Sequence, residues 1–271
     1  MRVLLITILL TLGMAANVYY YREIWYYSVE YDECSTLISQ STLYHPKCNY
    51  DANEIYTLLV TSTPRSGTTT TYHVLSRSGI HVTHDFEKNI GSDGTISWMM
   101  AFKDSNQFGP QKQNKTLFKN IFHQVREPLS SITSMCTEPI SEKSYLEFIS
   151  RHINTDDWPT DPHELQNSIY VRMSFWYQWH DFLDKMGYPR YKIEDGSETW
   201  SVYASIFSKV PHMSDDTRVN GRTHRPKLSW NDLYTVDATL AKKIKEKSIL
   251  YGYEYKDHPF RTPNKNPSCL I

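Results

Sequence analysis

The chain has 271 residues, 39% of them hydrophobic, with a formal net charge of −1 and a pI near 6.8. This length and composition suffice for a single α/β domain with one sizeable core. The near-neutral balance gives no global basic field, which argues against nucleic acid as a partner and requires any anion site to be local.

The first 21 residues are predicted to form a signal anchor. Arg2 is followed by an uncharged, mostly apolar run to Tyr21, near the lower length limit for spanning a bilayer. Aromatic residues at 19–27 suit an interfacial belt, and Arg2 with the free amine favours a cytosolic N-terminus. We therefore expect a single-pass type II membrane protein whose domain faces the Golgi lumen. Gly13-Met14-Ala15 also has the form of a cleavage site, so secretion after signal cleavage is the alternative.

Residues 22–54 are predicted to be a stem, because polar, aromatic and charged residues are mixed there. Cys34 and Cys48 would close a small loop in an oxidising compartment. Cys136 and Cys269 are the other two cysteines, and the sequence leaves the pairing open. The triplet at 114–116, Asn-Lys-Thr, is a glycosylation sequon that fits a lumenal loop.

The predicted domain, residues 55–255, begins with a strand at 55–62, a tight turn and a helix at 68–78. The turn and the first helical turn combine one arginine, one glycine, several hydroxyls and free backbone N–H groups at a helix N-terminus. That combination suits a phosphate or sulfate group. The residues concerned, which follow Pro64, are Arg65, Ser66, Gly67, Thr68, Thr69 and Thr70.

The nucleoside-triphosphate loop, G-x-x-x-x-G-K-[ST], does not fit this turn. Its first glycine is absent, because Ser62 and Thr63 occupy that neighbourhood. Its lysine is also absent, because Thr68 follows Gly67. The positive charge instead stands before the glycine, at Arg65.

A second group of donors follows a strand predicted at 120–125. Arg126 stands at the strand end, and Ser134 lies eight positions later on a helix predicted to begin at Pro128. The arginine offers a rigid fork of donors that suits a phosphate, and the serine supplies another donor.

Periodicity and capping residues predict the rest of the domain. We expect a strand at 80–83, a loop with short helices at 85–118, a helix at 168–186, a strand at 191–193 and helices after a capping box at Ser229. Residues 256–271 are predicted to be coil. Strands alternating with helices imply a mainly parallel β-sheet flanked by helices, with ligands at the carboxyl ends of the strands. No zinc-type cysteine spacing occurs, so no metal is predicted.

The two donor motifs resemble those of the sulfotransferases that use 3′-phosphoadenosine 5′-phosphosulfate (PAPS). The family's 5′-phosphosulfate loop reads Pro-[Arg/Lys]-Ser-Gly-[Thr/Ser]-[Thr/Ser], and its 3′-phosphate motif is a strand ending in arginine with a serine eight positions later. Weaker similarity at 94–98, 190–195 and 220–225 extends the resemblance to about residues 56–253. The resemblance implies a P-loop-like sulfotransferase fold of the membrane-anchored Golgi type.

The resemblance also implies roles for single residues. Residues 65–70 would hold the 5′-phosphosulfate, and Arg126 and Ser134 the 3′-phosphate. Arg222 and Arg225 are weaker candidates for the same 3′-phosphate. The family's general base lies just after the second strand, where Asp85 is the first candidate and His84 the second. Many cytosolic members have lysine where this chain has Arg65, and arginine cannot act as a proton donor.

Sulfuryl transfer to an acceptor hydroxyl or amine is therefore the predicted activity. A secretory-lumen location favours a glycan, a glycolipid or a protein tyrosine as acceptor, with carbohydrate first among them. One alternative is a P-loop nucleotide kinase or other phosphotransferase, which would need a Walker lysine and magnesium ligands. The other is an inactive protein on the same fold that binds only the desulfated donor, 3′-phosphoadenosine 5′-phosphate (PAP).

Overall fold

The computed structural model describes residues 55–84, 90–98, 118–208, 228–255 and 269. The predicted anchor at 1–21 and stem at 22–54 lie outside the described residues, as do the sequon and the cysteines at 34 and 48. Within the described part of the chain, no helix combines the length and the apolar character needed to cross a bilayer.

Among the described residues, five parallel strands form one sheet in the order β2-β3-β1-β4-β5. The strands are β1 (Tyr56–Thr61), β2 (Val82–His84), β3 (Gly94–Ile96), β4 (Phe118–Val125) and β5 (Arg190–Lys192). In the central strand, Leu59 lies level with Thr95 of β3 and Ile121 of β4. β1 is covered on both faces, which explains its nearly continuous apolar sequence. The predicted α/β class with a mainly parallel sheet is confirmed.

β3 lies inside the sheet, between β2 and β1. Its residues belong to the segment 85–118, and the prediction of loop and short helices is wrong there. Gly94 has a φ of 140°, and a Cβ at this position would lie 1.9 Å from the carbonyl oxygen of Leu58. The close approach of β1 and β3 therefore requires glycine, which is a residue that weakens the sequence signal of a strand.

In the described part of the chain, helices follow β1, β4 and β5. They are α2 (Thr68–Arg77), α4 (Pro128–Met135), α5 (Lys143–Ser150), α6 (Pro162–Asn167), α7 (Ile169–Met186), α8 (Ser197–Phe207), α9 (Trp230–Val236) and α10 (Ala238–Leu250). A 3-10 turn, η1 (Ile193–Asp195), links β5 to α8. The predicted helices at 68–78 and 168–186 and the capping box of Ser229 with Asp232 are confirmed.

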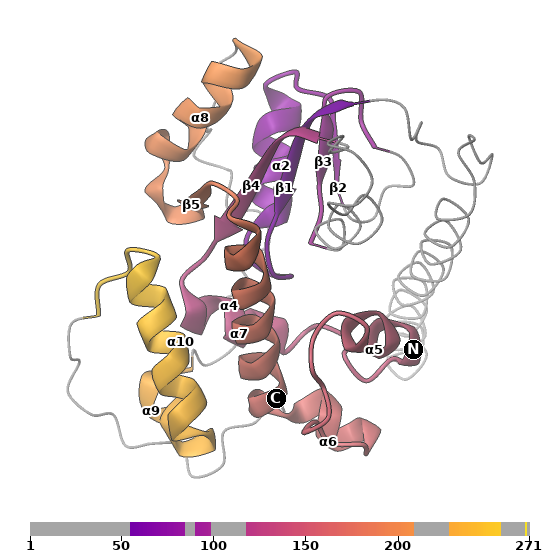
Figure 1. Ribbon diagram of the computed structural model, residues 1–271, viewed down its shortest axis with the longest axis vertical. Coiled ribbons are helices and arrows are strands. Elements are labelled where there is room, and N and C mark those ends of the chain that lie inside the picture. Colours follow the sequence, from indigo (N-terminus) through magenta and orange to yellow (C-terminus); the bar gives the residue numbers. More distant parts are fainter. Residues whose placement is uncertain (1–54, 85–89, 99–117, 209–227, 256–268, 270–271) are drawn as a thin grey trace, which may run out of the picture.

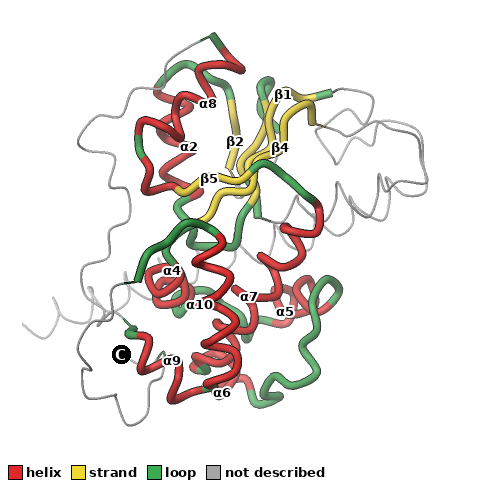
Figure 2. Tube along the Cα trace, turned by 60° about the vertical axis from the view of Figure 1, so that its left-hand side comes forward, coloured by secondary structure: helices red, strands yellow, loops and turns green. Residues whose placement is uncertain are grey.

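Two main hydrophobic clusters hold this arrangement together. Leu58 and Val60 of β1 pack with Val74 of α2 and Trp200 of α8. A larger cluster joins α4, α5, α7, α9 and α10 around Trp179 and its neighbours. Figure 1 shows α2 and α8 alongside the sheet and the other helices gathered below it, and Figure 2 shows the same division after rotation. The loops after β1 and β4 lie between these two packed regions.

A disulfide fixes the end of α4. Cys136, the C-cap of this helix, is bonded to Cys269, and Cys269 is buried. The backbone N–H of Cys269 also donates to the carbonyl oxygen of Asn167, at the end of α6. The predicted C-terminal tail is therefore attached to the domain at this residue, while 256–268 lie outside the described residues.

Candidate functional site

The loop between β1 and α2 has an unusual backbone. Arg65 and Gly67 both adopt left-handed conformations, with φ of 65° and 86°. Left-handed residues occur in backbone nests, which are short segments whose successive N–H groups point toward one bound anion. A Cβ on Gly67 would lie 3.2 Å from Ile193 Cγ1, so side-chain packing as well as the positive φ favours glycine. The backbone conformation of the loop thus suits N–H donors to an anion, and Gly67 packs closely against Ile193.

Two side chains from the end of β4 hold consecutive carbonyl groups of this loop. Gln124 Nε2 donates to the Ser66 carbonyl oxygen at 2.7 Å, and Arg126 Nη1 donates to the Arg65 carbonyl oxygen at 2.9 Å. In a trans peptide, the C=O group and the following N–H group point in opposite directions. The N–H groups of Ser66 and Gly67 therefore face away from Gln124 and Arg126.

The N-terminus of α2 adds further donors. Among the described residues, no side chain caps this helix end. The first N–H groups of a helix have no partner within it, and the helix dipole places partial positive charge there. Thr68 is buried in the first turn, whereas Thr69 and Thr70 are partly exposed. The end of α2 is suited to a negative charge.

The two donor motifs predicted from the sequence meet at this loop. Arg65 Nε donates to Ser134 Oγ on α4 at 3.1 Å, although the two residues are 69 positions apart. Burial lowers the pKa of Arg126 while Glu194 raises it, and the guanidinium remains protonated. A guanidinium has five N–H donors, and the bond to the loop uses one of those of Arg126. Arg65, Arg126 and Ser134 therefore form one cluster.

The side chain of Ser66 points inward. Its hydroxyl contacts the hydroxyls of Thr63 and Ser131 and is fully buried. An anion on the outer side of the loop would therefore meet the backbone N–H of Ser66 rather than its hydroxyl.

Two buried histidines lie behind Thr63. Thr63 Oγ1 is 3.4 Å from His180 Nε2, and His180 Nδ1 is 2.7 Å from His123 Nε2. Burial lowers the pKa of His123 to about 3 and that of His180 well below its usual value, so both rings are neutral. His123 Nδ1 lies 3.6 Å from Asp184. That carboxylate also accepts hydrogen bonds from Arg190, Lys247 and Tyr251.

Of the two candidate bases, one is described. His84 ends β2, is 8% exposed, and places Nε2 3.1 Å from Thr68 Oγ1 in the first turn of α2. Asp85 lies outside the described residues, as do Arg222 and Arg225. His84 is therefore adjacent to the helix end that would meet an anion.

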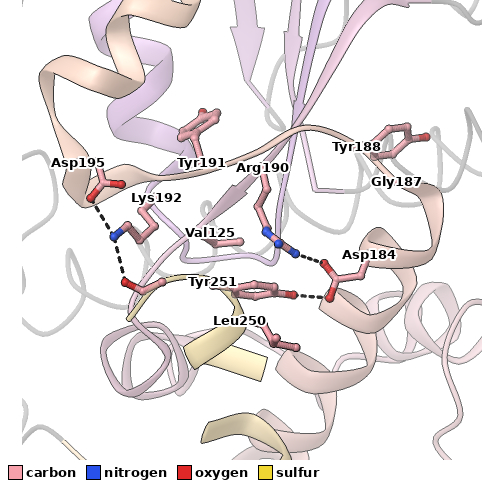
Figure 3. Close-up of a pocket in the computed structure, with 11 residues that line it drawn as sticks. Val125, Asp184, Gly187, Tyr188, Arg190, Tyr191, Lys192, Asp195, Leu250 and Tyr251 are labelled. Carbon is pink, nitrogen blue, oxygen red and sulfur yellow. Dashed lines mark hydrogen bonds and ion pairs between the residues drawn. The ribbon is translucent and has the colours of Figure 1, made fainter. Parts of the chain in front are cut away.

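A pocket of about 610 Å³ opens beside the edge strand β5. Figure 3 shows its charged side chains in pairs, with Arg190 bound to Asp184 at 2.9 Å and Lys192 to Asp195 at 3.2 Å. Val125, the last residue of β4, forms part of the wall, so the pocket reaches the carboxyl end of the sheet. The sequence did not predict this pocket, because its lining comes from separate segments with no common motif.

Gln124 is the main residue of the site that the sequence predictions missed. The available signal was a pair of polar residues, His123 and Gln124, inside a strand that is otherwise mostly apolar. Both side chains are buried, and each is hydrogen-bonded to a group outside β4.

No group of three or more metal-binding side chains occurs among the described residues. No family model, curated protein or solved structure matches the chain. The function must therefore be inferred from the geometry of the loop and its neighbours.

Proposed function

We propose that this chain is a sulfotransferase that moves the sulfuryl group of PAPS to an acceptor hydroxyl or amine, with carbohydrate as the acceptor class. The contact between Arg65 and Ser134 is the observation that carries this proposal. It brings together two sequence motifs that resemble the two phosphate-binding elements of the family. Arg126, from the second motif, also binds the loop of the first.

In this proposal the 5′-phosphosulfate lies against the Arg65 guanidinium, the N–H groups of Ser66 and Gly67, and the first turn of α2 at Thr68, Thr69 and Thr70. Arg126 and Ser134 hold the 3′-phosphate, which suits a rigid fork of donors beside a hydroxyl. Arg222 and Arg225 remain candidates for the same phosphate.

The reaction forms a bond from the acceptor oxygen or nitrogen to sulfur, and breaks the bond between sulfur and the 5′-phosphate oxygen. Negative charge then collects on that phosphate oxygen. N–H dipoles at the start of α2 and the charge of Arg65 would stabilise it. Transfer of this kind depends mainly on in-line positioning and electrostatics.

The acceptor proton passes to a general base. The sequence puts Asp85 first for this role, but the 3.1 Å contact between His84 and Thr68 favours His84. In the proposal His84 takes the proton, because Thr68 is itself assigned to the phosphosulfate.

The proposed location is the lumen of the Golgi, reached through a single-pass type II anchor at 1–21 or, alternatively, by secretion after cleavage. The disulfide between Cys136 and Cys269 supports an oxidising compartment, because such bonds are rare in the cytosol. A glycan, a glycolipid or a protein tyrosine would be available there as acceptor.

Titration calorimetry of the full chain with PAP, and in parallel with ATP and magnesium, tests the donor assignment. We expect PAP to bind, and Ser134→Ala to weaken binding by about 10-fold through loss of one charge-assisted contact. Ser130→Ala on the same helix is the matched control. Binding of ATP and magnesium alone would support the kinase alternative. PAP binding without transfer from PAPS to any glycan, glycolipid or peptide acceptor would support the alternative of an inactive PAP-binding protein.

A further inference from the structure

We propose that Gln124 is a positioning residue, which orients the Ser66–Gly67 peptide so that the Gly67 N–H faces a bound sulfate or phosphate group. This inference rests on the proposed function for the place of the anion. It assigns a task to a residue that belongs to neither of the two donor motifs.

Gln124 is fully buried, and both the nitrogen and the oxygen of its side-chain amide are hydrogen-bonded. Nε2 donates to the Ser66 carbonyl oxygen at 2.7 Å. Oε1 accepts hydrogen bonds from Thr71 Oγ1 of α2 and, at 2.7 Å, from the Tyr191 hydroxyl of β5. A carbonyl oxygen can only accept, whereas both hydroxyls can donate, so one orientation of the amide satisfies all three partners.

The hydrogen bonds behind this amide run in one direction. Burial raises the pKa of the Tyr191 and Tyr203 phenols, so both remain protonated. The Tyr191 hydroxyl donates its hydrogen bond to Gln124 Oε1, so the hydrogen bond between the two tyrosines must be donated by Tyr203. Each bond in such a chain polarises the next. The chain starts at α8 and ends at the carbonyl group of Ser66.

The consequence for the loop follows from peptide geometry. With the Ser66 carbonyl held by Gln124, the Gly67 N–H points the opposite way, and it becomes a stronger donor because the peptide is polarised. Gln124 also packs against the glycine, since a Cβ there would lie 3.5 Å from Nε2. Loss of this amide would free the peptide to rotate and would leave a carbonyl group without its donor.

Two substitutions separate positioning from simple packing. Gln124→Met keeps the length of the side chain and removes the donor, so we expect PAP affinity to fall by about 10-fold or more at every pH. Gln124→Glu also lacks the donor when ionised, but a protonated carboxyl can donate to Ser66. Its affinity relative to the parent should therefore recover between about pH 7.5 and about pH 5.5, because burial raises the pKa of a carboxyl.

The surroundings of residue 124 allow this pH comparison. Among the described residues, the phenol of Tyr191 contacts its amide and the phenol of Tyr203 contacts Tyr191, and both phenols stay protonated. The neighbouring charge on its own strand end is Arg126, which stays positive. Ser62→Ala is the matched control. The Ser62 hydroxyl is buried and donates to the backbone carbonyl oxygen of Gln124, not to its side-chain amide.

Calorimetry with PAP at both pH values, on the full chain, is the first measurement. Equal affinity of Gln124→Met and the parent, or pH-independent weakening in Gln124→Glu, would overturn the inference. If Ser62→Ala is weakened as much as Gln124→Met, the effect is one of packing and the inference also fails.

A second measurement keeps the inference separate from the proposed function. The chain has ten glycines, so labelling them with ¹⁵N gives a simple amide spectrum. We expect inorganic sulfate to shift the Gly67 amide signal in the parent and not in Gln124→Met. A parent that shows this shift but does not bind PAP would contradict the proposed function alone. No shift in the parent, or the same shift in both proteins, would refute the positioning role.

Discussion

Arg65 Nε lies 3.5 Å from Glu138 Oε1, beside the hydrogen bond that the same nitrogen donates to Ser134. The carboxylate is held in place by the Tyr145 hydroxyl, which donates to its other oxygen at 3.0 Å. Both charged side chains are mostly buried, with exposed fractions of 19% and 15%. A bound anion must therefore share Arg65 with a fixed negative charge.

We expect Glu138→Gln to strengthen PAP binding by about 3- to 10-fold, because it removes a negative charge next to the anion. The gain should shrink at high ionic strength. Calorimetry at low and high salt measures both effects, with Glu164→Gln on the exposed side of α6 as control. Unchanged or weaker binding in Glu138→Gln would show that this carboxylate does not compete for Arg65.

Replacement of the proposed base should affect the chemical step and leave donor binding intact. We expect His84→Gln to lower kcat by about 10²- to 10⁴-fold, the usual contribution of a general base, with PAP affinity nearly unchanged. The measurement is transfer of labelled sulfate from PAPS to a glycan acceptor, together with PAP calorimetry. Asp85→Asn is tested in parallel, and a loss confined to that variant would move the role to Asp85.

The buried histidine pair should make the fold sensitive to acid. Burial lowers the pKa of His123 from 6.5 to about 3, and it lowers the pKa of His180 well below its usual value. Below about pH 6.5 the unfolded chain binds protons that the folded chain excludes. The contribution of the two neutral histidines to the free energy of unfolding is therefore fully present above that pH. It is lost as the pH falls, by up to about 1.4 kcal/mol per pH unit for each histidine.

Urea unfolding at about pH 7.5, 6 and 5 checks this dependence. His180→Phe should reduce the pH slope by about half, since one of the two histidines no longer titrates. His81→Gln, at an exposed position, should leave the slope unchanged. Equal slopes in His180→Phe and the parent would contradict the assignment of the slope to this pair.

Arg172 should be one of the most sensitive positions for stability. Its guanidinium is fully buried and donates to backbone carbonyl oxygens at the end of α4 and around α6. These oxygens belong to Met135, Glu138, Leu165 and Gln166. Arg172→Met fills similar space but removes all four of these buried hydrogen bonds to a charged donor, so we expect a loss of about 3–5 kcal/mol.

The measurement is the free energy of unfolding in urea. Lys242→Ala is the control, because that lysine is 71% exposed and its ion pair with Glu246 spans 3.9 Å. We expect this control to change stability by less than about 0.5 kcal/mol. A loss below about 1 kcal/mol in Arg172→Met would mean that the carbonyl groups find other partners.

The elements that frame the site were predictable because each has a local signal. β1 is a mostly apolar run, α2 follows a Pro-Arg-Ser-Gly turn, and α7 is capped by Ser168 and Gly187. The resemblance to the sulfotransferases also implied that Arg65 and Ser134 lie close together, because the two family motifs that these residues resemble bind the same donor. That prediction needed the resemblance, since spacing alone does not bring α4 to the first loop.

The features that the sequence did not predict depend on contacts between distant parts of the chain. β3 has three residues and begins with a glycine that only the approach of Leu58 explains. The pairing of Cys136 with Cys269 spans 133 positions and has no local signal. The role of Gln124 likewise becomes visible only when Ser66, Thr71 and Tyr191 surround it. Short elements and buried polar groups are specified by tertiary structure rather than by local pattern.

The bond between Cys136 and Cys269 also changes what a break in the backbone would do. Everything from the end of α4 to residue 269 forms a closed covalent ring, which includes α7, β5 and α10. A single proteolytic cut anywhere in this ring opens it without releasing a fragment. The disulfide would keep the C-terminal piece attached to the end of α4, the helix that carries Ser134. The two pieces would separate only after the disulfide is reduced.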